Sequence, residues 1–410
     1  MNYTIANKYA ELIVKVGVNV QKNQLVVVNC PVQHASFSQI VAKKCYEAGA
    51  KYVDVRYFND YVSAMNMTYG DLEYIETPKE FIKVRNQSDI ENNVCYIHLI
   101  SDYVGVMDDC DPKRLAASRR ATMLMNKNRR EYSNANKGQW TIAALPNPVW
   151  AKKVFPYLSE NDALAALEKA ILETVYVNET NDPIDAWKQQ NKKLASLVEK
   201  MNNFNFKSLH FTNSLGTDID VPLVENHRWA GGSSFNVDGV EYDANMPTEE
   251  VFCMPDCRGT QGKVVASKPL SYMGKIIDGF YLEFDKGKVV NFGAQQNQEV
   301  LDDLIHSCEG ADSIGEIALI SYHSPISIQN ILYFDTLFDE NASCHMALGD
   351  SYSENVVNGA TMSKEELKAI GGNHCDNHVD FMFGTHDMHV VGITHDGQNI
   401  DVFVNGDFVI

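Results

Sequence analysis

Residues 24–57 read QLVVVNCPVQHASFSQIVAKKCYEAGAKYVDVRY and decide the fold of the N-terminal half. The segment opens with an apolar run, residues 24–30, that is typical of a buried strand. Residues 34–50 follow with a helical pattern that ends at a glycine, and residues 51–57 read as a second strand. A strand, a helix and a strand in this order predict a βαβ unit, the building block of an α/β domain.

The same alternation continues to about residue 205. An amphipathic helix is predicted for residues 3–18, and a capping box at residues 77–80 predicts the start of another helix. The apolar stretches 92–101 and 139–146 read as buried strands, and the basic stretch 113–132 between them reads as a solvated helix. A long helix is predicted from Asp182-Pro183 to about Met201.

From about residue 206 the sequence pattern changes and predicts strands joined by tight turns. Residues 209–223, 280–294 and 389–410 alternate apolar and polar side chains, and the last of these carries the hairpin dipeptides DG and NG. Helices are predicted only at residues 297–310 and after Ser363, which opens a second capping box. We therefore predict the fold class α/β, with a Rossmann-like α/β domain at residues 1–205 and an antiparallel-rich α+β domain at residues 206–410.

Composition excludes several classes of function. The 410 residues carry 35 Lys and Arg against 54 Asp and Glu, a net charge of −19, which argues against nucleic acid as a partner. Since no run of about 18 apolar residues occurs, no membrane insertion is expected. The N-terminal pattern lacks a signal-peptide cleavage site, so a cytoplasmic location is predicted. Nine scattered cysteines favour reduced thiols over a disulfide framework.

Common catalytic motifs are missing. Gly262-Lys263 is followed by Val264 rather than by Ser or Thr, and the first βα junction has no glycine, so neither a Walker loop nor a dinucleotide fingerprint is present. No G-x-S-x-G elbow occurs. Cys344 and Cys375 each adjoin a histidine, but neighbours on a strand point to opposite faces, which disfavours a thiol nucleophile.

Metal-assisted hydrolysis has stronger support, and all of it lies in the C-terminal half. Glu316 interrupts the otherwise apolar stretch SIGEIALI, where a carboxylate must be paired, hydrogen-bonded or coordinated to tolerate burial. His378 and Asp380 are one residue apart in NHVDFMFG, so on a strand both face the same side. Glu250 follows the Pro-Thr turn of NMPTEEVF, where a carboxylate can enter a partly buried site.

The stretch DENASCHMALGDSY, residues 339–352, adds Glu340, His345 and Tyr352 to this set. Carboxylates then outnumber imidazoles, which is the donor set that suits two divalent metal ions with a carboxylate between them.

These motifs resemble, in order and spacing, the metal-dependent family of thermophilic aminopeptidase T and aminopeptidase S (PepS). The matching stretches are MPTEEVF, GEIALI, SPIS, TLFDENASCHMALGDSY and HVDFM. The resemblance implies a cytoplasmic, homodimeric exopeptidase that hydrolyses N-terminal residues of peptides with broad specificity. It also implies two divalent ions per chain, cobalt, zinc or magnesium, held by Glu250, Glu316, Glu340, His345, His378 and Asp380.

The resemblance leads to a mechanism in which a water activated by two metals attacks the first peptide carbonyl. Glu316 is the candidate bridge, Glu340 or Glu316 takes the proton from water, and Tyr352 donates a hydrogen bond to the oxyanion. Two alternatives stay open at this point, namely a single-metal amidase or deaminase and a non-catalytic peptide-binding protein.

Overall fold

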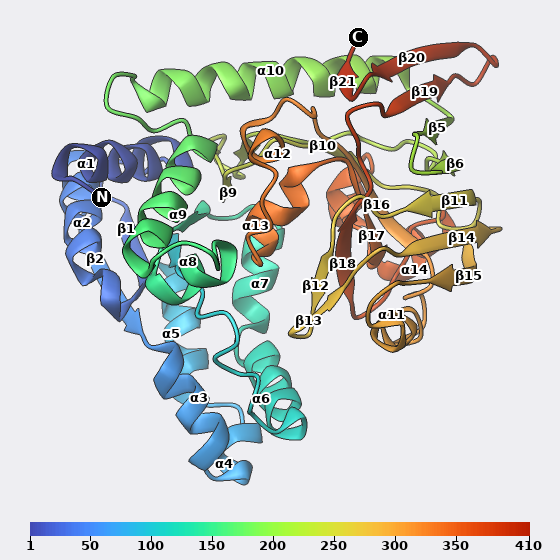
Figure 1. Ribbon diagram of the computed structural model, residues 1–410. Helices are drawn as coiled ribbons and strands as arrows, with labels where there is room; N and C mark the ends of the chain where they lie inside the picture. Colours follow the sequence, from blue (N-terminus) through green and yellow to red (C-terminus); the bar gives the residue numbers. More distant parts are fainter. The chain divides into compact units, whose positions relative to one another are not determined.

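The computed structural model describes residues 1–410, which divide into two compact units (Figure 1). Unit 1 comprises Met1–Gln189 and Ser233–Pro247, and unit 2 comprises Gln190–Gly232 and Thr248–Ile410. The chain therefore returns to unit 1 after the boundary predicted at residue 205. That boundary, as a division into independent domains, stays a prediction.

Unit 1 is built on a five-stranded parallel sheet with the strand order β2-β1-β3-β4-β9. Its strands are β1 (Leu25–Pro31), β2 (Tyr52–Phe58), β3 (Cys95–Ile100), β4 (Trp140–Ala144) and β9 (Asn245–Met246). The first four lie in the apolar runs that predicted them. They are parallel because helical crossovers connect them, as the βαβ pattern requires.

One face of this sheet packs on the first two helices (Figure 1). Helix α1 (Tyr3–Leu12) continues into a π-helical turn (Ile13–Gly17), and α2 (Ala35–Glu47) is the crossover between β1 and β2. Their apolar stripes meet alternate residues of the strands, including Val26 and Val28, in a dry core. The predicted βαβ unit is thus confirmed.

Seven further helices complete unit 1. They are α3 (Asp60–Tyr69), α4 (Leu72–Glu76), α5 (Glu80–Glu91), α6 (Pro112–Met125), α7 (Lys127–Asn134), α8 (Pro148–Val154) and α9 (Glu160–Thr174). A short hairpin, β7 (Ser234–Phe235) and β8 (Glu241–Tyr242), lies in the returning segment.

Two helix predictions in unit 1 are wrong. The capping box expected at residues 77–80 does not form, because the Thr77 hydroxyl donates to the Glu73 carbonyl oxygen at 2.6 Å and closes α4 instead. Helix α5 begins later, at Glu80. The basic stretch forms two helices rather than one, since α6 ends before Asn126 and α7 begins after it.

Unit 2 contains two larger antiparallel sheets. The eight-stranded sheet has the order β15-β14-β11-β6-β5-β19-β20-β21. Its strands are β5 (Ser208–Thr212), β6 (Asp218–Pro222), β11 (Gln261–Val265), β14 (Tyr281–Asp285), β15 (Lys288–Gly293), β19 (His389–Ile393), β20 (Asn399–Val404) and β21 (Asp407–Phe408). The hairpins predicted from the turn dipeptides are therefore present.

The four-stranded sheet has the order β10-β16-β17-β18. It consists of β10 (Val251–Cys253), β16 (Ile314–Leu319), β17 (His345–Gly349) and β18 (His378–Met382), and a separate ribbon pairs β12 (Leu270–Tyr272) with β13 (Lys275–Ile277). The helices are α10 (Pro183–Phe204, which begins in unit 1), α11 (Gln298–Ile305), α12 (Pro325–Gln329), α13 (Thr336–Asp339) and α14 (Lys364–Ala369). The predicted fold class, a parallel α/β part followed by an antiparallel-rich part, is confirmed.

The capping box predicted at Ser363 is present, with Ser363 and Glu366 bonded reciprocally. The prediction of reduced thiols rather than a disulfide framework holds for seven of the nine cysteines, whereas Cys308 and Cys375 form a disulfide. These two are 67 residues apart, and tertiary folding brings the end of α11 beside the segment that precedes β18. Sequence spacing alone carries no signal of such a pair.

No helix combines the length and the apolar composition that crossing a bilayer requires.

Gly262 in β11 allows this strand to lie close to β6 in the eight-stranded sheet. Its φ is +118°, and an added Cβ would lie 2.3 Å from the Asp218 carbonyl oxygen on the neighbouring strand. We expect Gly262→Ala to lower the free energy of unfolding by about 3 kcal/mol, because it combines an unfavourable φ with a backbone clash. Gly397→Ala is the control, since its φ is +83° but its Cβ meets no atom within 4 Å. The control should lose only about 1 kcal/mol, and equal losses in chemical denaturation would contradict the clash.

Candidate metal centre

Four neighbouring strands bring the candidate residues together in unit 2. Glu316 lies in β16, His345 begins β17, and His378 and Asp380 lie in β18, while Glu250 directly precedes β10. The register pairs Ala318 with His345, and His345 with Met382, so the candidates of adjacent strands fall near one another. All six residues of β16 are buried, which makes Glu316 a carboxylate inside a core strand.

Two groups of three ligand atoms share Glu316. In the first, His345 Nε2 lies 3.4 Å from Glu250 Oε2 and 3.4 Å from Glu316 Oε1. In the second, His378 Nε2 lies 3.7 Å from Glu316 Oε2 and 3.3 Å from Asp380 Oδ1. Each group is compact enough to hold one cation, and one carboxylate reaches both.

Glu340 and Tyr352 flank these groups without belonging to either. Glu340 begins a 3-10 turn after α13, and the negative charges of Asp380, Glu250 and Glu316 act on its carboxylate. The Tyr352 ring contacts the His378 ring, with 4.6 Å between the centroids. The structure therefore brings together five of the seven predicted residues in the two groups and places the other two beside them.

The electrostatics of the site reflect crowded carboxylates. Burial raises the pKa of Glu250 to about 8, and the charges of Glu316 and Asp380 add to this rise against the opposing imidazoles. Burial likewise raises the pKa of Glu340 well above its usual range. Such groups hold protons at neutral pH unless a cation takes their place.

The imidazoles respond in the opposite sense. Burial by itself lowers the pKa of His345, but the neighbouring carboxylates Glu316, Glu250 and Asp380 outweigh it and raise the pKa to about 9. Burial is outweighed in the same way at His378, whose pKa Asp380 and Glu316 raise to about 9. The protein thus surrounds both imidazoles with negative charge, as a cation site does.

Two further groups orient the candidate ligands. The Asp350 backbone carbonyl accepts a hydrogen bond from His378 Nδ1 at 2.8 Å, which fixes the tautomer that leaves Nε2 free for a ligand. The Asn341 side chain accepts from the Glu249 backbone N–H at 2.8 Å and so fixes the segment that carries Glu250. A backbone carbonyl leaves no sequence signal, whereas Asn341 is predicted as an orienting group by its place between Glu340 and His345, and its amide is fully buried.

The donor atoms fit a divalent cation. Glu316 Oε2 and Asp380 Oδ1 are buried and have no hydrogen-bond partner, although buried polar atoms are normally satisfied. Carboxylate oxygens and imidazole nitrogens are the ligands that zinc, cobalt and related ions take in proteins. The side chains present at this site are therefore suitable ligands for a divalent metal ion.

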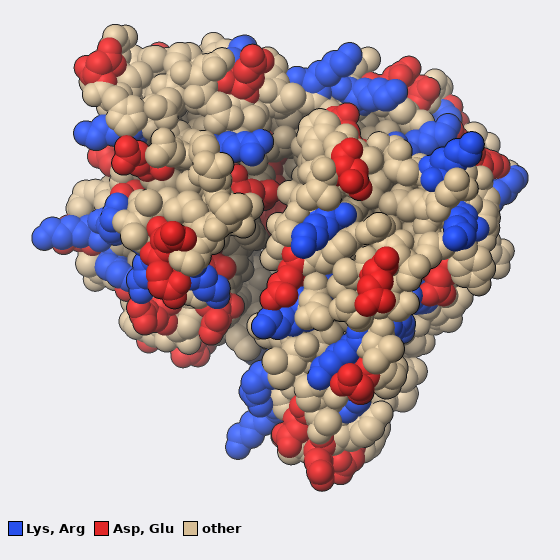
Figure 2. Space-filling model, turned by 180° about the vertical axis from the view of Figure 1, so that it is seen from behind, with Lys and Arg blue, Asp and Glu red and all other residues tan.

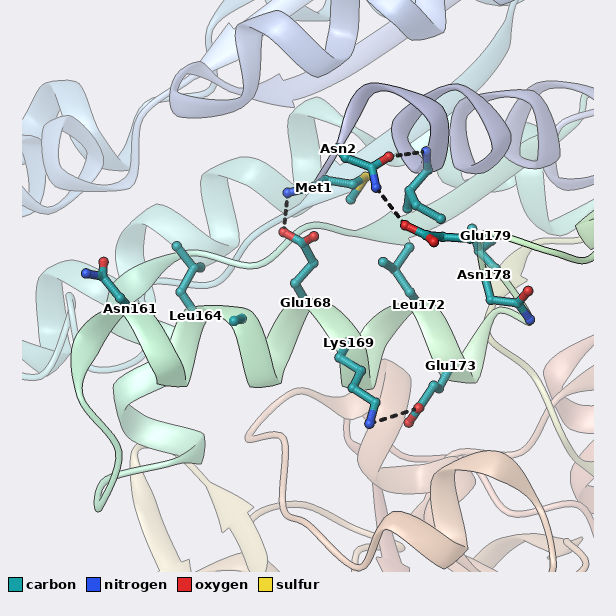
Figure 3. A pocket seen from close by; sticks show the side chains of 13 residues that line it. Met1, Asn2, Asn161, Leu164, Glu168, Lys169, Leu172, Glu173, Asn178 and Glu179 are labelled. Carbon is teal, nitrogen blue, oxygen red and sulfur yellow. Dashed lines mark hydrogen bonds and ion pairs between the residues drawn. The ribbon is translucent and has the colours of Figure 1, made fainter.

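The competing sites are weaker. The Cys344 thiol is buried under Ile320, and burial raises its pKa to about 12, so it has the environment of an inert core cysteine. A cavity of about 550 Å³ lies in unit 1 between α1 and α9 (Figure 3). Its charged groups are already paired, since the Met1 ammonium contacts Glu168 at 2.5 Å and Lys169 contacts Glu173 at 3.7 Å. Neither site offers an activated group.

Comparison with known proteins agrees with this centre. The profile of the thermophilic metalloprotease family M29 matches residues 4–408. Aminopeptidase AmpS of Bacillus subtilis (strain 168) is 40% identical over 98% of both chains, and aminopeptidase 2 of Geobacillus stearothermophilus is 38% identical over 98% of this chain and 97% of its own. The structure of wild-type AmpT from Thermus thermophilus superposes with a TM-score of 0.92 and 31% identity, over 99% of both chains.

The match covers both units and every candidate residue, which selects among the functions that the sequence left open. An amidase, a deaminase or a non-catalytic binder has no support from these relatives, all of which are aminopeptidases. The chain therefore belongs to the thermophilic metalloprotease family M29, and it is a metalloaminopeptidase, a hydrolase of the exopeptidase class.

Proposed function

We propose that this metalloaminopeptidase works with two divalent cations per chain, cobalt, zinc or magnesium. The proposed ligands are Glu250, Glu316, Glu340, His345, His378 and Asp380. The observation that carries the proposal is the shared carboxylate, because Glu316 offers one oxygen to the group around His345 and the other to the group around His378. A carboxylate that serves two groups is the usual bridge in two-metal hydrolases.

Charge supports two ions rather than one. Four carboxylates gather here, those of Glu250, Glu316, Glu340 and Asp380, and the fully ionised set carries four negative charges. With neutral imidazoles, two divalent cations balance this charge, whereas one leaves two negative charges in the interior. Uncompensated buried charge is strongly unfavourable.

Bound divalent cations would supply Lewis-acid polarisation of the scissile carbonyl and a water with a lowered pKa. The protein's own groups perform the remaining tasks. Glu340 lies outside both groups, so its carboxylate is the candidate to accept the proton from the attacking water, with Glu316 as the other candidate. Burial, with the charges of Glu316 and Asp380, keeps the pKa of Tyr352 far above neutrality, so its hydroxyl stays protonated and can donate to the oxyanion.

The substrates are peptides with a free N-terminus, as the enzyme class implies, and we propose broad specificity for the residue removed. We also propose a cytoplasmic location, for which the seven free cysteines are the supporting observation. The net charge of −19 is not gathered in one patch on the face seen in Figure 2, where acidic and basic side chains are interspersed. Part of the acidic excess is instead buried in the metal centre.

We propose a homodimer, and an exposed apolar surface in unit 1 supports it. Helix α6 packs against α3, α4 and α5 (Figure 1), and several large apolar side chains of this helical group are exposed. They include Tyr61, Met65, Tyr69, Tyr74, Phe81, Val84 and Leu124, with Tyr69 84% exposed. Monomeric proteins rarely expose so many large apolar side chains together, whereas subunit interfaces do.

Glu316→Gln should lower turnover of an aminoacyl anilide by at least about 100-fold, because the bridge loses its charge while its shape is kept. Glu283→Gln is the matched control. That glutamate lies on β14, partly exposed and 3.5 Å from Lys263, away from the proposed ligands. Near-normal turnover in the Glu316 variant would refute its assigned role.

Metal content distinguishes two ions from one. After dialysis against zinc or cobalt, elemental analysis should find two ions per wild-type chain. Glu250→Gln and Asp380→Asn should each keep one ion, because each substitution damages one group and spares the other. A chelator should abolish hydrolysis, and added cobalt or zinc should restore it. One ion per wild-type chain would contradict the two-metal proposal without affecting the enzyme class.

Light scattering tests the dimer. The molar mass measured for the wild-type protein should be twice the chain mass of 46.0 kDa. Tyr69→Glu combined with Phe81→Glu should shift it to the monomer, because two charges would have to be buried in the interface. Tyr157→Glu provides the control, since Tyr157 is 99% exposed and lies outside the helical group. Dimers that survive the double substitution would place the interface elsewhere.

A further inference from the structure

The second face of the parallel sheet in unit 1 carries a row of polar side chains. Asn29 of β1 is in register with Arg56 of β2 on one side and with His98 of β3 on the other, so the three lie side by side. All three are in the carboxyl half of their strands. The strand order reverses between β1 and β3, and open α/β sheets bind ligands at the carboxyl ends of strands beside such a reversal.

Helices α5 and α7 cover this row and add charge to it. Asp89 of α5 is buried, and its carboxylate accepts from Arg56 Nη1 at 2.6 Å, from Arg56 Nη2 at 2.9 Å and from the Tyr96 hydroxyl at 3.0 Å. The two helices are joined by the Asn86 amide, which donates to Asn126 Oδ1 at 2.9 Å. Arg56 Nε also donates to Asp54 at 2.7 Å, so Arg56 is paired with two carboxylates, and Asp89 accepts three hydrogen bonds.

Arg129 of α7 is different, because it is a partly buried cation with no acceptor. Its guanidinium lies over the Tyr96 ring, 5.3 Å from the centroid, and forms no hydrogen bond and no ion pair. Burial lowers its pKa, Tyr96 and the charge of Asp89 oppose this lowering, and the charges of Arg56 and Arg85 add to it. The aromatic face and the Asp89 charge thus compensate part of the cost of desolvating the guanidinium, and its N–H donors remain available to an incoming acceptor.

His98 supplies a second donor, and it contacts the same Tyr96 ring as Arg129. The Asn29 amide donates to His98 Nδ1 at 3.2 Å, which leaves the proton of the neutral ring on Nε2. Burial lowers the pKa of His98 to about 4, and the charge of Arg129 contributes, so the ring is neutral at pH 7. The ring stacks on Tyr96, with 5.8 Å between the centroids, and Tyr96 is the same ring that supports Arg129.

We propose that Arg129 and His98 form a binding site for a small oxyanion, a phosphate or carboxylate group, on this face of the sheet. Arg129 would provide the charge and a planar pair of donors, and His98 Nε2–H would provide a neutral donor. The site lies wholly within unit 1, shares no residue with the metal centre, and does not depend on the two-metal proposal.

Calorimetric titration of the metal-loaded enzyme with inorganic phosphate tests the site. Arg129→Gln should weaken phosphate binding at least about tenfold, the scale of a lost charged hydrogen bond. Arg130→Gln is the matched control, since this neighbouring arginine is exposed and contacts only the Met123 carbonyl, so its affinity should stay within about twofold of wild type. Both variants keep the metal centre, and phosphate bound there contributes equally to each.

A variant that retains the charge guards against a folding defect. Arg129→Lys keeps the cation but loses the planar fork, so its affinity should fall between wild type and Arg129→Gln, with circular dichroism and anilide hydrolysis unchanged in all variants. Equal phosphate affinity in wild type and Arg129→Gln would overturn the proposal. If Arg129→Gln weakens phosphate binding, two further ligands identify the natural oxyanion. Tighter binding of adenosine monophosphate than of phosphate indicates a phosphate ester, whereas tighter binding of acetate than of phosphate indicates a carboxylate.

Discussion

Mutual repulsion among buried carboxylates is the constraint on which unit 2 depends. Glu250, Glu316, Glu340 and Asp380 converge in the interior of the protein, where water cannot screen them. Without a compensating cation the fold holds them only by keeping protons on the site, as the raised pKa of Glu250 indicates. Divalent ions at the proposed centre would resolve the same conflict. In that proposal, one electrostatic requirement governs both the structure of the site and its catalysis.

The four-stranded sheet brings these carboxylates and the two imidazoles together. Glu316 and His345 are 29 residues apart in the chain, yet adjacent strands bring their side chains to 3.4 Å. Antiparallel pairing fixes which residues face one another, and period-two alternation turns apolar neighbours toward the core of unit 2. A shift of register by one residue would send Glu316 into that core. The dense apolar packing of β16 and β17 therefore favours this register and, through it, the arrangement of the proposed ligands.

The same logic explains what the sequence could predict. His378 and Asp380 were identifiable because a strand places alternate residues on one side, and Glu316 because a charge inside an apolar strand needs a partner. Prediction from the sequence failed where one side chain could serve two different structural roles. Thr77 can cap the start of one helix or the end of another, and tertiary context chose the second. The Cys308–Cys375 bond, the return of residues 233–247 to unit 1 and the Asp350 carbonyl all depend on contacts between segments far apart in sequence.

The two units solve the problem of buried charge in different ways. In unit 1, Arg56 pairs with Asp89 through two hydrogen bonds and with Asp54 through a third, so these charges are compensated by side chains of the chain itself. In unit 2, the carboxylates outnumber the local cations, and the two histidines become compensating charges only by taking up protons. Ligands that bind the folded state alone add to its stability, and ions at this centre meet that condition, since the unfolded chain has no such arrangement. In the proposed function, folding of unit 2 and loading of its metal centre are therefore thermodynamically linked, and none of the proposed ligands lies in unit 1.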